Sequence, residues 1–195
     1  MRANAGSLVG LTALLALGYR LSGLPMGTPD SRYPIADSPS WQVPRSQHGT
    51  VTQRVSNTDI TISYNRPVAR GRELFGSLVH WGRIWHPGAD SVSTISFSKD
   101  VTIDGHALAA GRYSLWTIPE APPKPWTVIF NRGVGGWHTN YPGESRDALR
   151  LSVATETGPH IETLTYYFPV VDADSAVLRL QWGTVVVPMK IKVTQ

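Results

Sequence analysis

The densest gathering of side chains that could bind a ligand or do chemistry lies between Asn65 and Asp90, in the string NRPVARGRELFGSLVHWGRIWHPGAD. This is the longest stretch of the chain without an alternating hydrophobic pattern, so it predicts a long connection between two strands. Long ordered loops on a rigid sheet scaffold are where binding residues gather. We therefore take the loop from Arg66 to Asp90 as the candidate ligand surface, extended by Trp137, His138 and Tyr141 from a second loop.

Arg66 and Arg72 are the first candidates within this loop. A guanidinium fork can hold a carboxylate, phosphate or sulfate through two parallel hydrogen bonds. The alternative is structural, with both arginines bonding backbone carbonyls of their own loop, or Glu73, and so locking its conformation. We favour this alternative, because pinning is the commoner use of arginine in a long loop.

Trp81 and Trp85 lie four residues apart and could stack together on a sugar ring or a flat ligand if both were exposed. The alternative is that they pack in the core. The chain has seven tryptophans, and in a small sheet protein most of them must be buried. Core packing is therefore the favoured interpretation for this pair.

His80, His86 and Asp90 define an enzyme alternative, because a His/His/Asp set suffices for zinc or ferrous iron. Their spacing matches no recognised metal signature, and no serine lies in a Gly-x-Ser-x-Gly elbow. We therefore predict no catalytic residue, no metal site and no cofactor. The candidate ligand-binding residues are Arg66, Arg72, Trp81, Trp85, His86, Asp90, Trp137, His138 and Tyr141.

Charge and cysteine content exclude several classes of function. The net charge of the 195-residue chain is +4, but its basic residues are scattered and form no stripe for tracking phosphates, so nucleic acid is not an expected partner. Cysteine is absent, which excludes disulfides, a thiolate nucleophile and a lipid-modified N-terminal cysteine.

The N-terminal region has the pattern of an export signal. Arg2 precedes the apolar run LVGLTALLAL at 8–17, which predicts a cleaved signal peptide over 1–24 or, alternatively, an uncleaved anchor with residues 7–21 in the membrane. Five prolines in 25–44 predict an extended linker, and the folded domain then occupies 45–195. The domain is expected to be extracytoplasmic, either periplasmic or secreted, and to meet a membrane only through an uncleaved leader.

The domain itself shows a hydrophobic period of two, which predicts strands with one buried face. Pro188, Lys190 and Lys192 share one face of the last strand and indicate a protected edge. Asp104-Gly105 suits a tight hairpin, Gly183-Thr184 a turn between the last two strands, and Pro142-Gly143 and Gly158-Pro159 loops. The result is an all-β antiparallel β-sandwich or jelly roll, with a closed barrel as the competing architecture. The predicted strands are 60–64, 92–97, 100–103, 112–118, 126–131, 148–154, 161–168, 176–182 and 185–193.

An ordered series of motifs resembles the bacterial exported proteins grouped as domain of unknown function 2911. It comprises TVTQRVSNTDITISYNRPVARGRELFG, GRIWHPGAD, DVTIDGHALAAGRYSLWTIP, PWTVIFNR and LRLQWGTVVVPMKI, and it covers residues 45–193. The resemblance implies a secreted or periplasmic single β domain and supplies no reaction. After Gly88-Ala89 the family pattern continues with asparagine and glutamate, whereas this chain has Asp90 and Ser91, which counts against a catalytic glutamate.

These observations favour a non-catalytic extracytoplasmic binding or interaction domain, whose ligand is a cell-envelope glycan, a small molecule or an envelope protein. An envelope hydrolase or metal-dependent enzyme using His80, His86 and Asp90 is the first alternative. A purely structural envelope module is the second.

Overall fold

The computed structural model describes residues 45–137 and 140–194. The predicted leader (1–24), the predicted linker (25–44) and His138 lie outside these residues. Within the described ranges no helix is long and apolar enough to cross a membrane.

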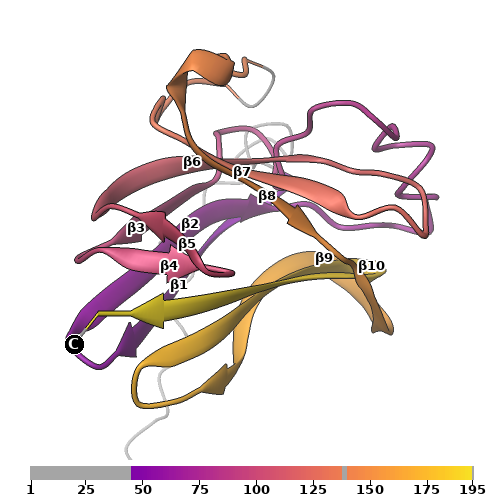
Figure 1. Cartoon of the computed structure of the whole chain (residues 1–195). Helices are drawn as coiled ribbons and strands as arrows, with labels where there is room; N and C mark the ends of the chain where they lie inside the picture. The colour runs from indigo at the N-terminus through magenta and orange to yellow at the C-terminus, as the bar shows by residue number, and fades with distance from the viewer. Residues whose placement is uncertain (1–44, 138–139, 195) are drawn as a thin grey trace, which may run out of the picture. The chain divides into compact units, whose positions relative to one another are not determined.

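The described residues form ten strands in two antiparallel sheets, which confirms the predicted all-β sandwich (Figure 1). The six-stranded sheet has the order β1 (Gln47–Val55), β2 (Thr58–Arg66), β3 (Thr94–Phe97), β6 (Gly111–Ile118), β7 (Trp126–Asn131) and β8 (Asp147–Val153). The four-stranded sheet has the order β5 (His106–Leu108), β4 (Val101–Ile103), β10 (Ser175–Val193) and β9 (Glu156–Val171). A 3-10 turn, η1 (Glu144–Arg146), precedes β8.

The core lies between the two sheets, because alternate residues of the strands point inward. Ile60, Ile62 and Tyr64 of β2 are buried, as the alternation in the sequence predicts. The ring of Tyr64 meets that of Tyr166 from β9 edge to face, with centroids 4.7 Å apart. Each fully buried aliphatic side chain of this kind stabilises the fold by about 1.5–3 kcal/mol.

The turn predicted at Gly183-Thr184 and the loop predicted at Gly158-Pro159 are both wrong, because both dipeptides lie inside long strands. Gly183 has a φ of 57° and lies within β10, where the pairing with β9 shifts register on either side of it. Glycine at positive φ here forms an irregularity in a continuous strand, and not a turn between two strands. Gly158-Pro159 likewise lies within β9, where a Cβ on Gly158 would come 3.0 Å from the side chain of Val186.

The predicted edge strand is also wrong, since β10 lies between β4 and β9. Its residues up to Val186 pair with β9, and Ile191–Val193 pair with β4. Pro188 lies between these two paired segments. Its missing N–H therefore removes no hydrogen bond between strands, although β10 is an interior strand of the sheet.

The tight turn and one loop are confirmed. Asp104 and Gly105 have φ values of 47° and 86° and close the β4–β5 hairpin, in which Ile103 pairs with His106. Pro142-Gly143 lies in the connection that leads to η1. The predicted strand set omitted two observed strands, β1 and β5.

Candidate functional site

The long connection predicted between Arg66 and Asp90 joins β2 to β3 and is hydrogen bonded to both sheets. On the β9 side, the N–H of Leu164 donates to Pro67 O at 2.9 Å, and the N–H of Ala69 donates to Glu162 O at 2.7 Å. On the β6 side, Trp85 and Thr117 exchange two backbone hydrogen bonds of 2.7 Å. The loop is therefore fixed on both sheets, which gives its side chains a defined position.

A cleft of about 440 Å³ lies along this loop, and we call it the arginine cleft. Its lining contains the side chains of three arginines and one carboxylate, next to two tryptophan rings. The lining residues are Arg45, Ser46, Pro67, Val68, Arg70, Arg72, Leu78, Val79, Trp85, Gly88, Ala89, Asp90 and Trp182. Three predicted site residues, Arg72, Trp85 and Asp90, thus meet in one concavity.

Arg72 is bonded to its own loop, as the structural alternative expects. Its Nε donates to Ala69 O at 2.9 Å and its Nη2 to Val68 O at 2.7 Å. A guanidinium has five N–H groups, so these bonds hold the head group in place and leave others for a ligand in the cleft. Arg72 can therefore stabilise the loop and bind a ligand at the same time.

Arg66 lies outside the arginine cleft. Its Nη2 donates to Thr165 Oγ1 at 3.0 Å and its Nε to Leu164 O at 3.4 Å, so its head group contacts β9 and not its own loop. The structure therefore separates the two arginines that the sequence pairs.

Arg70 lines the arginine cleft with an exposed side chain. Its backbone has a φ of 54° and its N–H donates to the carboxylate of Glu162. This N–H lowers the pKa of Glu162, with the hydrogen bond from His160 as the next cause. In the part of the chain that the structure describes, no hydrogen bond or ion pair involves the side chain of Arg70, so its charge can face a ligand.

The tryptophans belong to an aromatic cluster beneath the loop. Trp85 stacks on Trp182 of β10, with centroids 6.1 Å apart, and meets Trp126 edge to face. Trp81 stacks on Phe75 at 6.0 Å and lines a neighbouring groove of about 380 Å³. Trp81 and Trp85 are both partly buried and do not form one shared exposed platform.

His86 is a core residue. It is 2% exposed, and its Nε2 accepts the N–H of Ser93. The hydroxyl of Ser93 lies 2.9 Å from the same nitrogen and donates to Pro87 O at 3.0 Å. No sequence motif marks this serine–histidine pair, whose members are seven residues apart. Both side chains are buried, and the hydroxyl proton is committed to a carbonyl, so the pair is arranged as packing and not as a nucleophile.

The metal alternative needs His80, His86 and Asp90 to converge, and the structure does not bring them together. His80 is exposed and His86 is buried, while Asp90 lines the arginine cleft. Across the described ranges no group of three or more His, Asp or Glu side chains could hold a metal ion. Asp90 has a φ of 57°, a conformation that aspartate and asparagine tolerate better than other side chains, so its position has a conformational reason.

Two glycines of the loop are explained by close packing. A Cβ on Gly88 would lie 2.4 Å from Ser93 Oγ and 2.7 Å from His86 Cε1. A Cβ on Gly76, which has a φ of 96°, would lie 2.7 Å from Nε1 of Trp81. Both positions therefore need glycine for the loop to pack as it does.

The second predicted loop, between β7 and β8, contacts the first. Trp137 forms an isolated bridge with Ser91, and the N–H of Val92 donates to Gly136 O at 3.4 Å. With 54% of its surface exposed, Trp137 is the most accessible large hydrophobic residue among those described. The structure thus places the backbone of Trp137 beside Ser91, at the end of the first loop.

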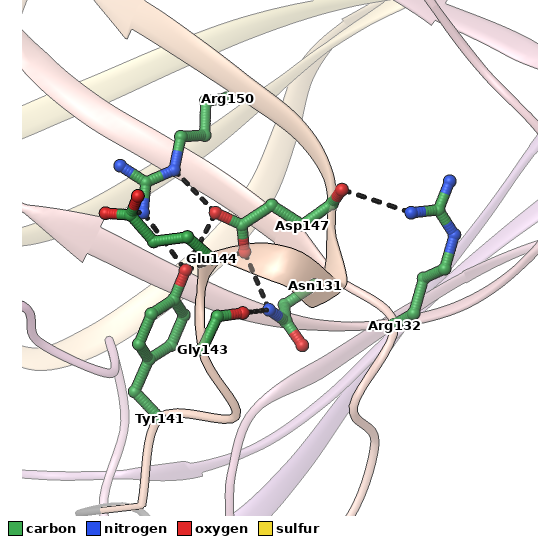
Figure 2. A network of polar contacts seen from close by, with 7 residues as sticks. All are labelled: Asn131, Arg132, Tyr141, Gly143, Glu144, Asp147 and Arg150. Atoms are coloured by element: carbon green, nitrogen blue, oxygen red, sulfur yellow. Dashed lines mark hydrogen bonds and ion pairs between the residues drawn. The ribbon is translucent and has the colours of Figure 1, made fainter.

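Tyr141 lies in a polar network that holds the same loop (Figure 2). Its hydroxyl donates to the carboxylate of Asp147 at 2.7 Å, and the same carboxylate accepts Nδ2 of Asn131 at 2.6 Å and Nε of Arg150 at 2.5 Å. Burial raises the pKa of Tyr141, and the hydrogen bond to Asp147 raises it further. The sequence did not point to Asp147, since no local pattern marks it as the centre of a network.

Comparison with known proteins places the chain in one family. The model of the family described as protein of unknown function (DUF2911) matches residues 46–191. No curated protein and no solved structure matches the chain.

Proposed function

The chain belongs to the DUF2911 family, and from this premise we propose that its β-sandwich is a non-catalytic extracytoplasmic domain that binds an anionic ligand of the cell envelope in the arginine cleft. The family is one of unknown function, so the proposal is supported by the geometry of the cleft. The ligand class we favour is a glycan that contains acidic sugars.

One observation carries this proposal: three arginines and a single carboxylate line a cleft whose wall includes two stacked indole rings. Guanidinium groups recognise carboxylates and sulfates through paired hydrogen bonds. Trp182 is buried and stacked on Trp85, so the partly exposed Trp85 supplies the aromatic surface for the apolar face of a sugar ring. The cleft volume of about 440 Å³ is within the range of small-ligand sites.

Binding is favoured over hydrolysis because the cleft lacks a pair of acid–base groups. Asp90 is the one carboxylate among its lining residues, and no histidine lines it. Hydrolysis of a glycan by the common mechanism uses two carboxyl groups that flank the bond to be broken. The arginine cleft therefore has the groups to hold an anionic ligand and lacks those to cleave it.

The cellular location follows from the predicted leader. An apolar run after Arg2 predicts export, and a domain without cysteine has no disulfide to form after crossing the membrane. We propose that the domain lies in the periplasm or is secreted, where acidic envelope glycans are accessible. Contact with the membrane would then require an uncleaved leader.

Calorimetric titration of the full chain with a hexamer of galacturonic acid, and with a neutral hexamer of galactose, tests the proposal. Arg70→Gln removes a cleft charge without breaking a side-chain hydrogen bond, so we expect about tenfold weaker binding of the acidic hexamer. Arg83→Gln is the matched control, because Arg83 is exposed in the same loop but does not line the cleft. Its affinity should equal that of the wild type.

Two results would overturn the proposal. One is the absence of any heat of binding with the acidic hexamer at millimolar concentration. The other is an Arg70→Gln protein that binds as tightly as the wild type and the Arg83→Gln control.

A further inference from the structure

A second cleft, of about 300 Å³, lies on the face of the six-stranded sheet that points away from the core, and we call it the polar cleft. Strands β1, β2, β3 and β6 contribute to it, and the loop between β7 and β8 closes one side. The lining residues are His48, Ser63, Tyr64, Asn65, Ser91, Val92, Thr94, Arg112, Val134, Gly135 and Gly136. No local sequence pattern marks Arg112 or His48 as a binding residue.

The chemistry of the polar cleft is that of a site for one anionic group among several hydroxyls. Its lining contains Arg112 and no aspartate or glutamate. Nη2 of Arg112 donates to Thr94 Oγ1 at 3.1 Å, which orients the guanidinium and leaves other N–H groups available. Hydroxyl, amide and imidazole groups surround it, so a carboxylate and neighbouring hydroxyls of a ligand would both find partners.

Three polar side chains of this cleft are held in position by hydrogen bonds to one another. His48 Nδ1 lies 3.1 Å from Asn65 Oδ1, and His48 Nε2 lies 3.3 Å from Ser63 Oγ. These contacts join β1 to β2 across a paired register, in which His48 is opposite Asn65. A ligand would therefore meet preorganised groups, which lowers the entropy lost on binding.

Three chain segments run from the polar cleft directly into the arginine cleft. At the start of β1, His48 lines the polar cleft, and Arg45 and Ser46, which precede the strand, line the arginine cleft. At the end of β2, Asn65 lines the polar cleft, and Pro67, which follows the strand, lines the arginine cleft. Ser91 lines the first and its neighbour Asp90 the second. Two residues of extended chain span roughly 7 Å, so the linings of the two clefts come close together at these three places, and we call the two clefts together the groove.

We propose that the polar cleft is a second subsite of this groove and that the ligand is a chain of acidic sugars long enough to occupy both subsites. This inference rests on the function proposed for the arginine cleft and specifies the ligand further. Arg112 binds one carboxylate while Arg70 and Arg72 bind another. A single acidic sugar fills one subsite only.

The test is the dependence of affinity on chain length. Calorimetry on the full chain compares oligomers of galacturonic acid from the dimer to the hexamer. The wild type is expected to bind the hexamer at least about tenfold more tightly than the dimer, because the second carboxylate contact adds on the order of 1.4 kcal/mol. Arg112→Gln should lose this gain, so that its affinities for the hexamer and the dimer become similar, whereas Arg70→Gln should weaken the binding of both oligomers.

Arg54→Gln is the matched control for Arg112→Gln. Arg54 lies on β1 with an exposed ion pair to Asp59 at 3.8 Å and does not line the polar cleft. Exposed pairs of this kind contribute little to stability. The Arg54→Gln protein should keep the full gain in affinity from dimer to hexamer.

The possible outcomes separate this inference from the proposed function. If the wild type binds acidic oligomers without dependence on length, or if Arg112→Gln keeps the full gain, the second subsite is overturned and the arginine cleft still stands. A poly-glutamate peptide of equal charge that binds as tightly as the hexamer would overturn the assignment to sugars. If no oligomer binds, both proposals fail.

Discussion

The indole rings of Trp85 and Trp182 stack with their centroids 6.1 Å apart and 14° between their planes. Trp85 belongs to the long β2–β3 connection and Trp182 to β10, so this contact joins the loop to the four-stranded sheet. Stacked aromatic pairs contribute about 0.5–1.5 kcal/mol beyond the burial of their surfaces. Because both rings also line the arginine cleft, replacing either one would disturb folding and binding together. The charged residues of the groove are the cleaner probes of function.

Replacing Gly88 by alanine is expected to destabilise the domain. The added Cβ would lie 2.4 Å from Ser93 Oγ, in a buried region that cannot move away at low cost. We expect a loss of about 1–3 kcal/mol in the free energy of unfolding, measured by urea denaturation. Gly49→Ala is the control, because its Cβ would meet the flexible side chain of Arg66 at 2.8 Å. Equal stabilities of the two variants would contradict this account of the loop.

Arg72→Ala is expected to lower the melting temperature by several degrees. The variant loses the two hydrogen bonds from the guanidinium to Ala69 O and Val68 O, which we expect to cost about 1–2 kcal/mol. Differential scanning calorimetry measures the effect, and Arg83→Ala, in the same loop, should melt close to the wild type. A wild-type melting temperature for Arg72→Ala would show that the loop does not depend on these bonds.

Asp147→Asn should loosen the β7–β8 loop. The carboxylate is 8% exposed and accepts hydrogen bonds from Tyr141, Asn131 and Arg150, whereas an amide would turn donors toward donors and leave Arg150 without this partner charge (Figure 2). The expected loss is about 2–3 kcal/mol. Chemical denaturation of Asp147→Asn, Tyr141→Phe and the double variant measures the coupling between them. Strictly additive effects would argue against a single network.

Acid should remove a stabilising contribution of Glu162. The N–H of Arg70 holds the pKa of this carboxyl below its ordinary value in the folded protein, so the ionised form stabilises the fold above the unfolded pKa. The ordinary pKa of glutamate is about 4.3, and the pKa of Glu162 in the folded protein is lower. The stabilising contribution is lost as the pH falls from the first value through the second. The gap in melting temperature between wild type and Glu162→Gln should therefore narrow on acidification. A gap that stays constant from neutral pH to about pH 3 would contradict this assignment.

The strands that the sequence could predict carry several buried apolar side chains, such as Ile60 and Ile62 in β2 and Ile129 and Phe130 in β7. β5 has three residues, of which Leu108 alone is buried, and β1 has Val55 as its one fully buried residue among mostly polar neighbours, so neither carries enough apolar side chains to be predicted. Gly183 shows a different limit. A glycine between two apolar runs fits a turn or a strand irregularity equally well, and only the pairing with β9 selects the second.

The two clefts differed in how far they could be predicted. Arg72, Trp85 and Asp90 share one irregular segment, so local composition was enough to place them together. His48, Asn65 and Arg112 are strand residues from distant parts of the chain, and only the registers of β1, β2, β3 and β6 bring them to one concavity. Buried groups such as Asp147 likewise gain their role from partners that no local pattern reveals.

The two ends of β10 pair with different strands of the four-stranded sheet. Ile191–Val193 pair with β4, which in turn pairs with β5 in a hairpin. The residues up to Val186 pair with β9. Neither β4 nor β5 contributes a residue to either cleft. Deleting residues 191–193 would therefore remove the register pairs between β10 and β4 and two buried core side chains, but none of the residues that line the two clefts. The pairing that attaches the β4–β5 hairpin to the sheet is thus separate from the residues proposed to hold the ligand.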